Sequence, residues 1–236
     1  MMKRLYRALV FCIPFVVADA QVIFLHLPKC AGTTTTALLR ASYPKTSIHP
    51  YRFVGQFICG NIEKCPKLQA QLIKQNPIDP SYELLDGHRP VWYLKAAHPN
   101  YDEAFKFTVL REPVSRVISH YRWSLNHRLA RFPQCDAPLG IKPNLMCRLL
   151  ASDCCVEGEE LLRQAIETLH TLDAVLFVKS LDKDLEHLFH KLGLPVCKPK
   201  HLRRSIRVKI EKSVIEEVCK ANALDIRLYE YALENF

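Results

Sequence analysis

The chain has 236 residues, 49% of them hydrophobic and 24% charged, and 33 Lys and Arg against 24 Asp and Glu give a formal charge of +9. This composition is typical of one globular domain and excludes a disordered chain or a coiled coil. A basic excess usually indicates an anionic partner, such as a nucleic acid, a nucleotide, an acidic sugar or a lipid.

The first twenty residues have the layout of a secretory signal peptide. Three basic residues precede an apolar run over 8–17, and a small-residue end follows at 18–20. The run is too short, and interrupted by Pro14, for a standard membrane span. We expect 1–20 to be a signal peptide or an N-terminal hydrophobic segment, ahead of a domain over 21–236. A signal peptide predicts that the protein is located in the lumen of the secretory pathway. If residues 1–20 are instead the first element of the fold, the protein would be cytoplasmic.

Strands alternate with helices along the rest of the chain. Buried strands are predicted over residues 21–27, 105–110 and 174–178. Helices are predicted after the first strand, after the second with Pro113 in its first turn, and over 157–172, 181–192 and 212–233. Residues 42–104 are less regular, and we expect them to be insertions over the carboxyl edge of the sheet. This order predicts an α/β fold, a single P-loop-like three-layer domain with a mainly parallel sheet.

The turn after the first strand could bind an anion. It reads Pro28-Lys29-Cys30-Ala31-Gly32 and leads into Thr33-Thr34-Thr35. N–H groups at a helix start are unsatisfied and the helix dipole adds positive charge, while Lys29 supplies a full charge and Gly32 permits close approach of the backbone. Such a turn would hold a phosphate or sulfate, although an ordinary polar turn has the same composition. It is not a Walker A loop, in which the lysine follows the second glycine.

The second strand end repeats the arrangement. Arg111 follows the strand over 105–110, and Ser119 lies about two helical turns later. An arginine fork and a serine hydroxyl could share one phosphate. Two such strand ends in one domain predict a ligand with two separated phosphate-like groups.

These segments resemble two motifs of the carbohydrate sulfotransferases that use 3′-phosphoadenosine 5′-phosphosulfate (PAPS). Residues 24–34 resemble their 5′-phosphosulfate loop, and residues 108–121 resemble their 3′-phosphate motif. The resemblance is closest to the heparan sulfate/uronyl 2-O-sulfotransferase branch, with weaker similarities at 86–88, 144–150 and 222–230. It implies a Golgi-type enzyme that moves a sulfuryl group from PAPS to a carbohydrate hydroxyl by in-line displacement, without a metal.

The resemblance also implies roles for individual residues. Lys29 and His88 would be catalytic, with Lys29 stabilising the leaving phosphate oxygen and His88 as general base. The donor would be bound by Lys29, Cys30, Ala31, Gly32, Thr33, Thr34, Thr35, Arg111, Ser119, Arg203 and Arg204. The acceptor would be bound by His26, Arg89 and Arg148, with His26 as an alternative base and Arg148 otherwise in a structural salt bridge.

Two features bear on the acceptor. Asp86 stands where the 2-O branch has the first histidine of His-Gly-His, which leaves His88 as the sole base from that motif. Residues 198–212 carry seven Lys or Arg and one Glu, and would suit an acidic sugar or the donor, or form a solvated face. No aromatic residues are interleaved there, so we do not expect nucleic acid as a partner. The alternatives are a P-loop-type nucleotide kinase or phosphotransferase, and a non-catalytic glycan-binding relative.

Overall fold

Four parallel strands form the centre of the fold, in the order β2-β1-β3-β4. They are β1 (Val22–Leu25), β2 (Leu84–Gly87), β3 (Phe105–Leu110) and β4 (Ala174–Phe177). The structure is a computed structural model and describes residues 21–50, 66–126, 138–196 and 209–236. The predicted signal segment over 1–20, and Arg203 and Arg204, lie outside the described residues.

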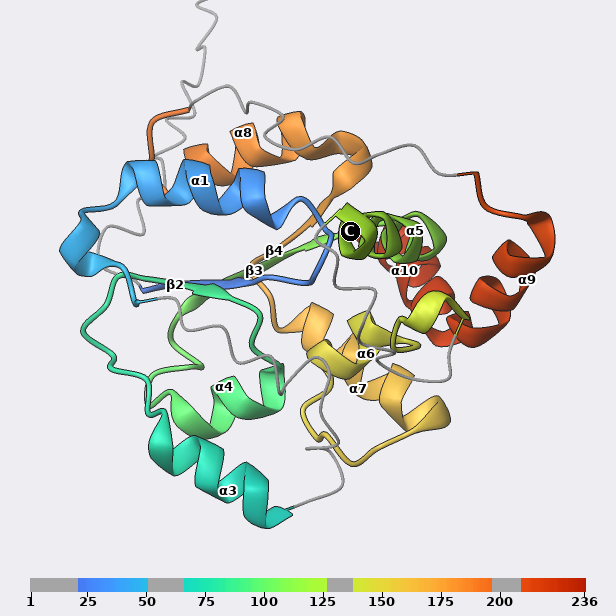
Figure 1. The fold of residues 1–236 in the computed structure, drawn as a ribbon. Helices are drawn as coiled ribbons and strands as arrows, with labels where there is room; N and C mark the ends of the chain where they lie inside the picture. Colours follow the sequence, from blue (N-terminus) through green and yellow to red (C-terminus); the bar gives the residue numbers. More distant parts are fainter. Residues whose placement is uncertain (1–20, 51–65, 127–137, 197–208) are drawn as a thin grey trace, which may run out of the picture.

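Helices cover both faces of this sheet. They are α1 (Gly32–Ser42), α3 (Pro66–Gln75), α4 (Val91–Ala97), α5 (Pro113–Asn126), α6 (Leu145–Leu150), α7 (Gly158–His170), α8 (Leu181–Lys191), α9 (Lys212–Ala221) and α10 (Ala223–Asn235). Figure 1 shows α1 and α8 over one face and α4, α6 and α7 over the other, with α5 and α10 beyond the strand ends. This three-layer arrangement confirms the predicted α/β fold. Among the described helices, none is long and apolar enough to cross a bilayer.

One prediction about the elements was wrong. Residues 42–104 are more than insertions, because they contain β2, which pairs in parallel with β1 from Val22–Leu84 to Leu25–Gly87. The strand has only four residues and ends in Asp-Gly, so it shows no long apolar run. The predicted helical segment over 212–233 is confirmed, and it is divided into two helices, α9 and α10, because Asn222 leaves the helical conformation at φ −112° and ψ 30°.

The central strands β1 and β3 are buried on both faces, and their parallel pairing from Val22–Phe105 to Leu25–Thr108 places their carboxyl ends at one edge of the sheet. All four residues of β1 and all six of β3 are buried, and the rings of Phe24 and Phe107 stack at 4.8 Å. Burying each such large apolar side chain stabilises the fold by roughly 1.5–3 kcal/mol. The Thr108 hydroxyl also donates to the Leu25 carbonyl at 2.8 Å. These contacts bring the turn after β1 and the residues after β3 to the same edge of the sheet.

Candidate active site

The turn between β1 and α1 has a strained backbone. Lys29 and Ala31 are both left-handed, at φ 68° and 56°, although neither is glycine. The Ala31 carbonyl accepts the N–H groups of Thr34 and Thr35, at 3.0 and 3.1 Å. Among the described residues, no acceptor meets the N–H groups of Ala31, Gly32 and Thr33. Three adjacent amide donors are therefore available to an anion at this edge, as the sequence predicts.

The three threonines differ in their availability. Thr33 is exposed and Thr34 half-buried, and their hydroxyls have no partner among the described residues. The Thr35 side chain is fully buried, and its hydroxyl donates to the Ala31 carbonyl at 3.3 Å. Thr33 and Thr34 could thus bind a ligand, whereas Thr35 stabilises the first turn of α1.

A contact with His26 requires glycine at position 32, in addition to the predicted approach of an anion, which stays a prediction. A Cβ atom at this position would lie 1.4 Å from Nε2 of His26. The His26 ring therefore occupies the space of a side chain at Gly32, and it also stacks on Phe24 with the centroids 5.1 Å apart. Gly32 admits this imidazole, and the contact fixes the start of α1 against the end of β1.

Cys30 lies inside the loop rather than on its surface. Its side chain is buried, and its thiol contacts the Pro28 carbonyl at 3.7 Å. Burial raises the pKa of this thiol to about 12, although the charges of Arg116 and Arg111 act in the opposite direction. The thiol is thus protonated at neutral pH and shapes the loop through packing.

His88 follows β2 and has a defined tautomer. Its Nδ1 is 2.7 Å from the His26 carbonyl, which can only accept, so Nδ1 carries the proton and Nε2 the lone pair. The His26 and His88 rings are 4.0 Å apart. Burial is the main cause that lowers the pKa of His88, and the charges of Lys29 and Arg89 lower it further. His88 is therefore neutral near pH 7, as a general base requires.

His26 supports His88 and is itself partly buried. Burial, followed by the charges of His88 and Lys29, holds the pKa of His26 well below its usual value. Its carbonyl binds His88 and its ring contacts Gly32. These contacts position the neighbouring groups, while the predicted contact of His26 with an acceptor stays a prediction.

Lys29 points toward α5. Its ammonium lies 5.3 Å from the centroid of the Trp123 ring, a cation–π contact. His120, one turn before Trp123, is buried with its ring 6.0 Å from that of Trp123. Burial, and then the charges of Arg116 and Lys29, lowers the pKa of His120 to about 3, so this imidazole is neutral.

Arg111 connects the two strand ends. Its Nη1 donates to the Lys29 carbonyl at 3.2 Å, and its guanidinium is partly buried. The first amides of α5 are already occupied, because the Glu112 carboxylate accepts the N–H groups of Val114 and Ser115 at 2.8 and 2.7 Å. An anion at this strand end would therefore rely on Arg111 and on Ser119, which is partly exposed on α5.

Asp86 and Arg89 are held by protein contacts around β2. Arg40 of α1 binds the buried Asp86 carboxylate in a bidentate ion pair, with distances of 2.9 and 2.7 Å. Arg89 is also buried; its Nη1 donates to the Asp86 carbonyl at 2.6 Å and its Nη2 lies 3.3 Å from Nδ1 of His49. Both side chains stabilise the strand that carries His88, and a contact of Arg89 with an acceptor stays a prediction.

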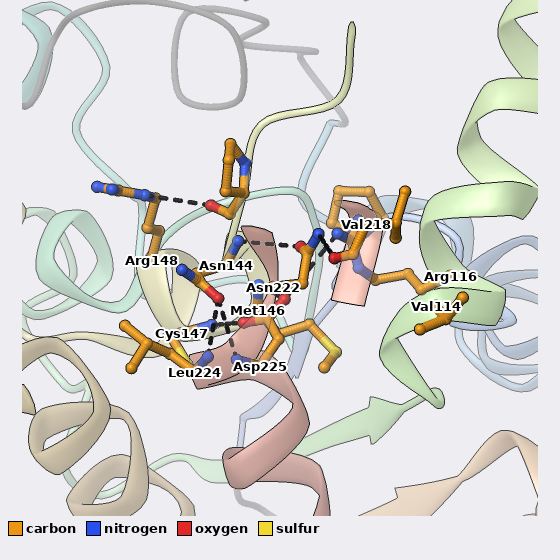
Figure 2. A network of polar contacts seen from close by, with 12 residues as sticks. Val114, Arg116, Asn144, Met146, Cys147, Arg148, Val218, Asn222, Leu224 and Asp225 are labelled. Carbon is orange, nitrogen blue, oxygen red and sulfur yellow. Dashed lines mark hydrogen bonds and ion pairs between the residues drawn. The ribbon is translucent and has the colours of Figure 1, made fainter. Parts of the chain in front are cut away.

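Arg148 lies apart from these groups. Its Nε donates to the Pro143 carbonyl at 3.3 Å, and Figure 2 shows its guanidinium pointing away from Arg116. Within the described ranges, one group of side chains, Asp153, Cys154 and Cys155, has potential metal ligands within 4.8 Å of one another. It lies between α6 and α7 and includes no residue of the loop or of β3.

One face of α5 carries residues that were not predicted to belong to the site. Arg116, His120 and Trp123 follow one another at helical spacing of four and three residues, which places them on the side that faces the loop. This spacing, downstream of Arg111, was the available signal. This face adds an aromatic ring in contact with the Lys29 ammonium and a buried positive charge that acts on the Cys30 thiol.

Comparisons with known proteins bear on the family and the fold of the chain. A model of the sulfotransferase family matches residues 14–134, just over half of the chain. A crystal structure of a sulfotransferase from Alicyclobacillus acidocaldarius is similar, with a TM-score of 0.50 and 15% identity over 93% of this chain and 98% of that chain. At that identity the similarity shows the fold alone. No curated protein matches at a significant level. Because the family match includes both strand ends described above, the chain belongs to the sulfotransferase family.

Proposed function

We propose that the protein transfers a sulfuryl group from PAPS to a hydroxyl of a carbohydrate, with His88 as general base. The observation that carries the proposal is the hydrogen bond from Nδ1 of His88 to the His26 carbonyl. This bond leaves the basic nitrogen of a neutral imidazole beside the loop that carries Lys29. A base, a cation and an array of open amides are the groups that sulfuryl transfer requires.

The loop residues would bind the 5′-phosphosulfate. Open N–H groups of Ala31, Gly32 and Thr33 can donate to its oxygens. Lys29 would turn from the Trp123 ring toward the bridging oxygen, where negative charge develops as the S–O bond breaks. Arg111 and Ser119 would bind the 3′-phosphate, which distinguishes this donor from simpler adenylates.

His88 would accept the proton of the attacking sugar hydroxyl at Nε2. The oxygen then bonds to sulfur as the bond to the leaving phosphate breaks, and the negative charge passes to the phosphate beside Lys29. Because the pKa of His88 is lowered, the imidazole is already deprotonated at neutral pH. General base catalysis of this kind contributes about 10²–10⁴-fold in rate.

The relation to the heparan sulfate/uronyl 2-O branch is part of the proposal. The bidentate pair with Arg40 holds Asp86 in place, so this carboxylate is unsuited to the role of the first histidine in that branch. We therefore infer a carbohydrate acceptor that is recognised with one histidine, His88 after β2, instead of two.

The experiment is sulfate transfer from PAPS to a panel of desulfated glycosaminoglycans. Lys29→Ala and His88→Asn should each lower kcat by about a hundredfold or more. A matched control is His187→Asn, an exposed histidine on α8, which should leave kcat unchanged. Full activity of the His88→Asn variant would remove His88 from the base role. Magnesium-dependent phosphate transfer from ATP would favour a phosphotransferase, and glycan binding without transfer would favour a non-catalytic relative.

A further inference from the structure

Arg116 of α5 is a fully buried cation. Its side chain has no exposed surface, and Nε, Nη1 and Nη2 have no hydrogen-bond partner among the described residues. The acid that faces it is Asp225 of α10, whose Oδ2 lies 3.9 Å from Nη2. Figure 2 shows the Arg116 guanidinium at the edge of a polar network that joins α5, α6 and α10.

The Asp225 carboxylate is engaged by other donors. Its Oδ2 accepts the Met146 N–H at 3.0 Å and its Oδ1 accepts the Cys147 N–H at 2.9 Å, which satisfies the first turn of α6. Asn144 binds in the reverse direction, because its Oδ1 accepts the N–H groups of Leu224 and Asp225. Asp225 and Asn144 thus cap each other's helices, and Arg116 gains only a longer-range attraction.

A buried guanidinium without hydrogen bonds is costly for a folded protein. Removing such an ion from water carries a large free-energy penalty unless hydrogen bonds and an opposite charge compensate it. Asp225 supplies part of the compensating negative charge, but it accepts no hydrogen bond from the Arg116 guanidinium. Part of the positive charge of Arg116 is therefore uncompensated, and the position of Arg116 in the fold indicates which groups this charge can act on.

The charge of Arg116 acts on both strand ends. Burial is the main cause that lowers the pKa of Arg111, which follows β3, and the charge of Arg116 lowers it further. The same charge opposes the rise that burial causes in the pKa of the Cys30 thiol in the loop. Along α5, Arg116 lies three residues before Ser119, so the two are neighbours on the helix surface. An anion held by Arg111 and Ser119 would therefore experience this buried positive charge in a region of low dielectric.

We propose that Arg116 is a positioning residue for the 3′-phosphate of the donor, whose incompletely compensated charge strengthens the binding of that phosphate by Arg111 and Ser119. The inference rests on the proposed PAPS donor. In this role the charge of Arg116 raises the affinity for adenosine nucleotides that carry a 3′-phosphate relative to those that lack it.

The test compares the affinities of two probes, adenosine 3′,5′-bisphosphate and adenosine 5′-monophosphate, by calorimetry and competition. Arg116→Met should weaken binding of the bisphosphate by about tenfold or more and binding of the monophosphate by less than about threefold. Arg116→Lys keeps the charge and should retain most of the preference. The matched control is Arg163→Met, an exposed arginine of α7.

A second variant separates this role from a merely structural one. Asp225→Asn removes the negative charge and weakens the cap of α6, so the melting temperature should fall while the preference for the bisphosphate is kept or raised. A loss of preference in Asp225→Asn, or equal losses for both probes in Arg116→Met, would overturn the inference. Failure of the wild-type chain to bind the bisphosphate would instead overturn the donor assignment, and this inference with it.

Discussion

The contact between His26 and Gly32 can be tested by a double-mutant cycle. Gly32→Ala places a methyl group 1.4 Å from Nε2 of His26, so the imidazole must leave its position against the helix. The backbone of Gly32 is not left-handed, and alanine can adopt it without strain. The cost of the substitution therefore arises from the displaced ring.

The expected magnitude follows from two opposing effects. Forcing a side chain out of a packed site costs about 1–3 kcal/mol, while replacing glycine by alanine within a helix gains up to about 1 kcal/mol. Displacing the ring also removes its stacking on Phe24. Gly32→Ala should thus lower the free energy of unfolding by about 2 kcal/mol in the wild-type chain. In the His26→Ala background the same substitution should be neutral or stabilising.

The measurement is urea unfolding of the wild type, both single variants and the double variant. The cycle should give a coupling energy of about 2 kcal/mol between the two positions. Equal costs of Gly32→Ala in the presence and absence of the imidazole would refute the reasoning, since the ring would then be no obstacle.

Three further predictions concern the loop, the ion pair and the base. Ala31→Gly should raise the free energy of unfolding by up to about 1 kcal/mol in urea, because glycine removes the cost of the left-handed backbone; a decrease would contradict this. Arg40→Met should lower the free energy of unfolding by about 3 kcal/mol, because it leaves the buried Asp86 carboxylate unpaired. Asp86→Asn should lower it by only about 1 kcal/mol, because the Arg40 side chain is 36% exposed and can reach water. The reverse order in thermal or urea unfolding would refute this assignment. The pH profile of kcat/KM should show an acidic limb with its midpoint below pH 6.5, because protonation of His88 removes the base and its pKa is lowered. A midpoint above 6.5 would show that His88 is not that group.

The central strands and the two strand ends could be predicted because they depend on local patterns. The run Phe105–Leu110 is continuously apolar except for Lys106 and Thr108, and it forms β3 with the predicted bounds. Lys106 fits this buried strand because its ammonium donates to three main-chain carbonyls, including that of Tyr101 at 3.1 Å. The sequence pattern alone could not supply these partners.

The rest of the site depends on contacts between distant segments. β2 has four residues and ends in Asp-Gly, so its place in the sheet becomes evident only through its pairing with β1. The need for glycine at position 32 arises from His26, six residues earlier, whose ring direction is set by packing on Phe24. The sequence predicts that Thr35 binds the donor like Thr33 and Thr34, because four consecutive threonines do not reveal where α1 starts. The start of α1 at Gly32 turns the Thr35 side chain inward.

The most direct test of the account is the binding of adenosine 3′,5′-bisphosphate, measured by calorimetry. The wild-type chain should bind this product of the proposed donor, and Arg111→Ala should weaken binding by about tenfold or more, as expected for loss of a charged phosphate contact. Arg163→Ala, which removes an exposed arginine paired with Glu160 and Glu167 on its own helix, should bind like the wild type. Absence of binding, or an affinity indifferent to Arg111, would contradict the account.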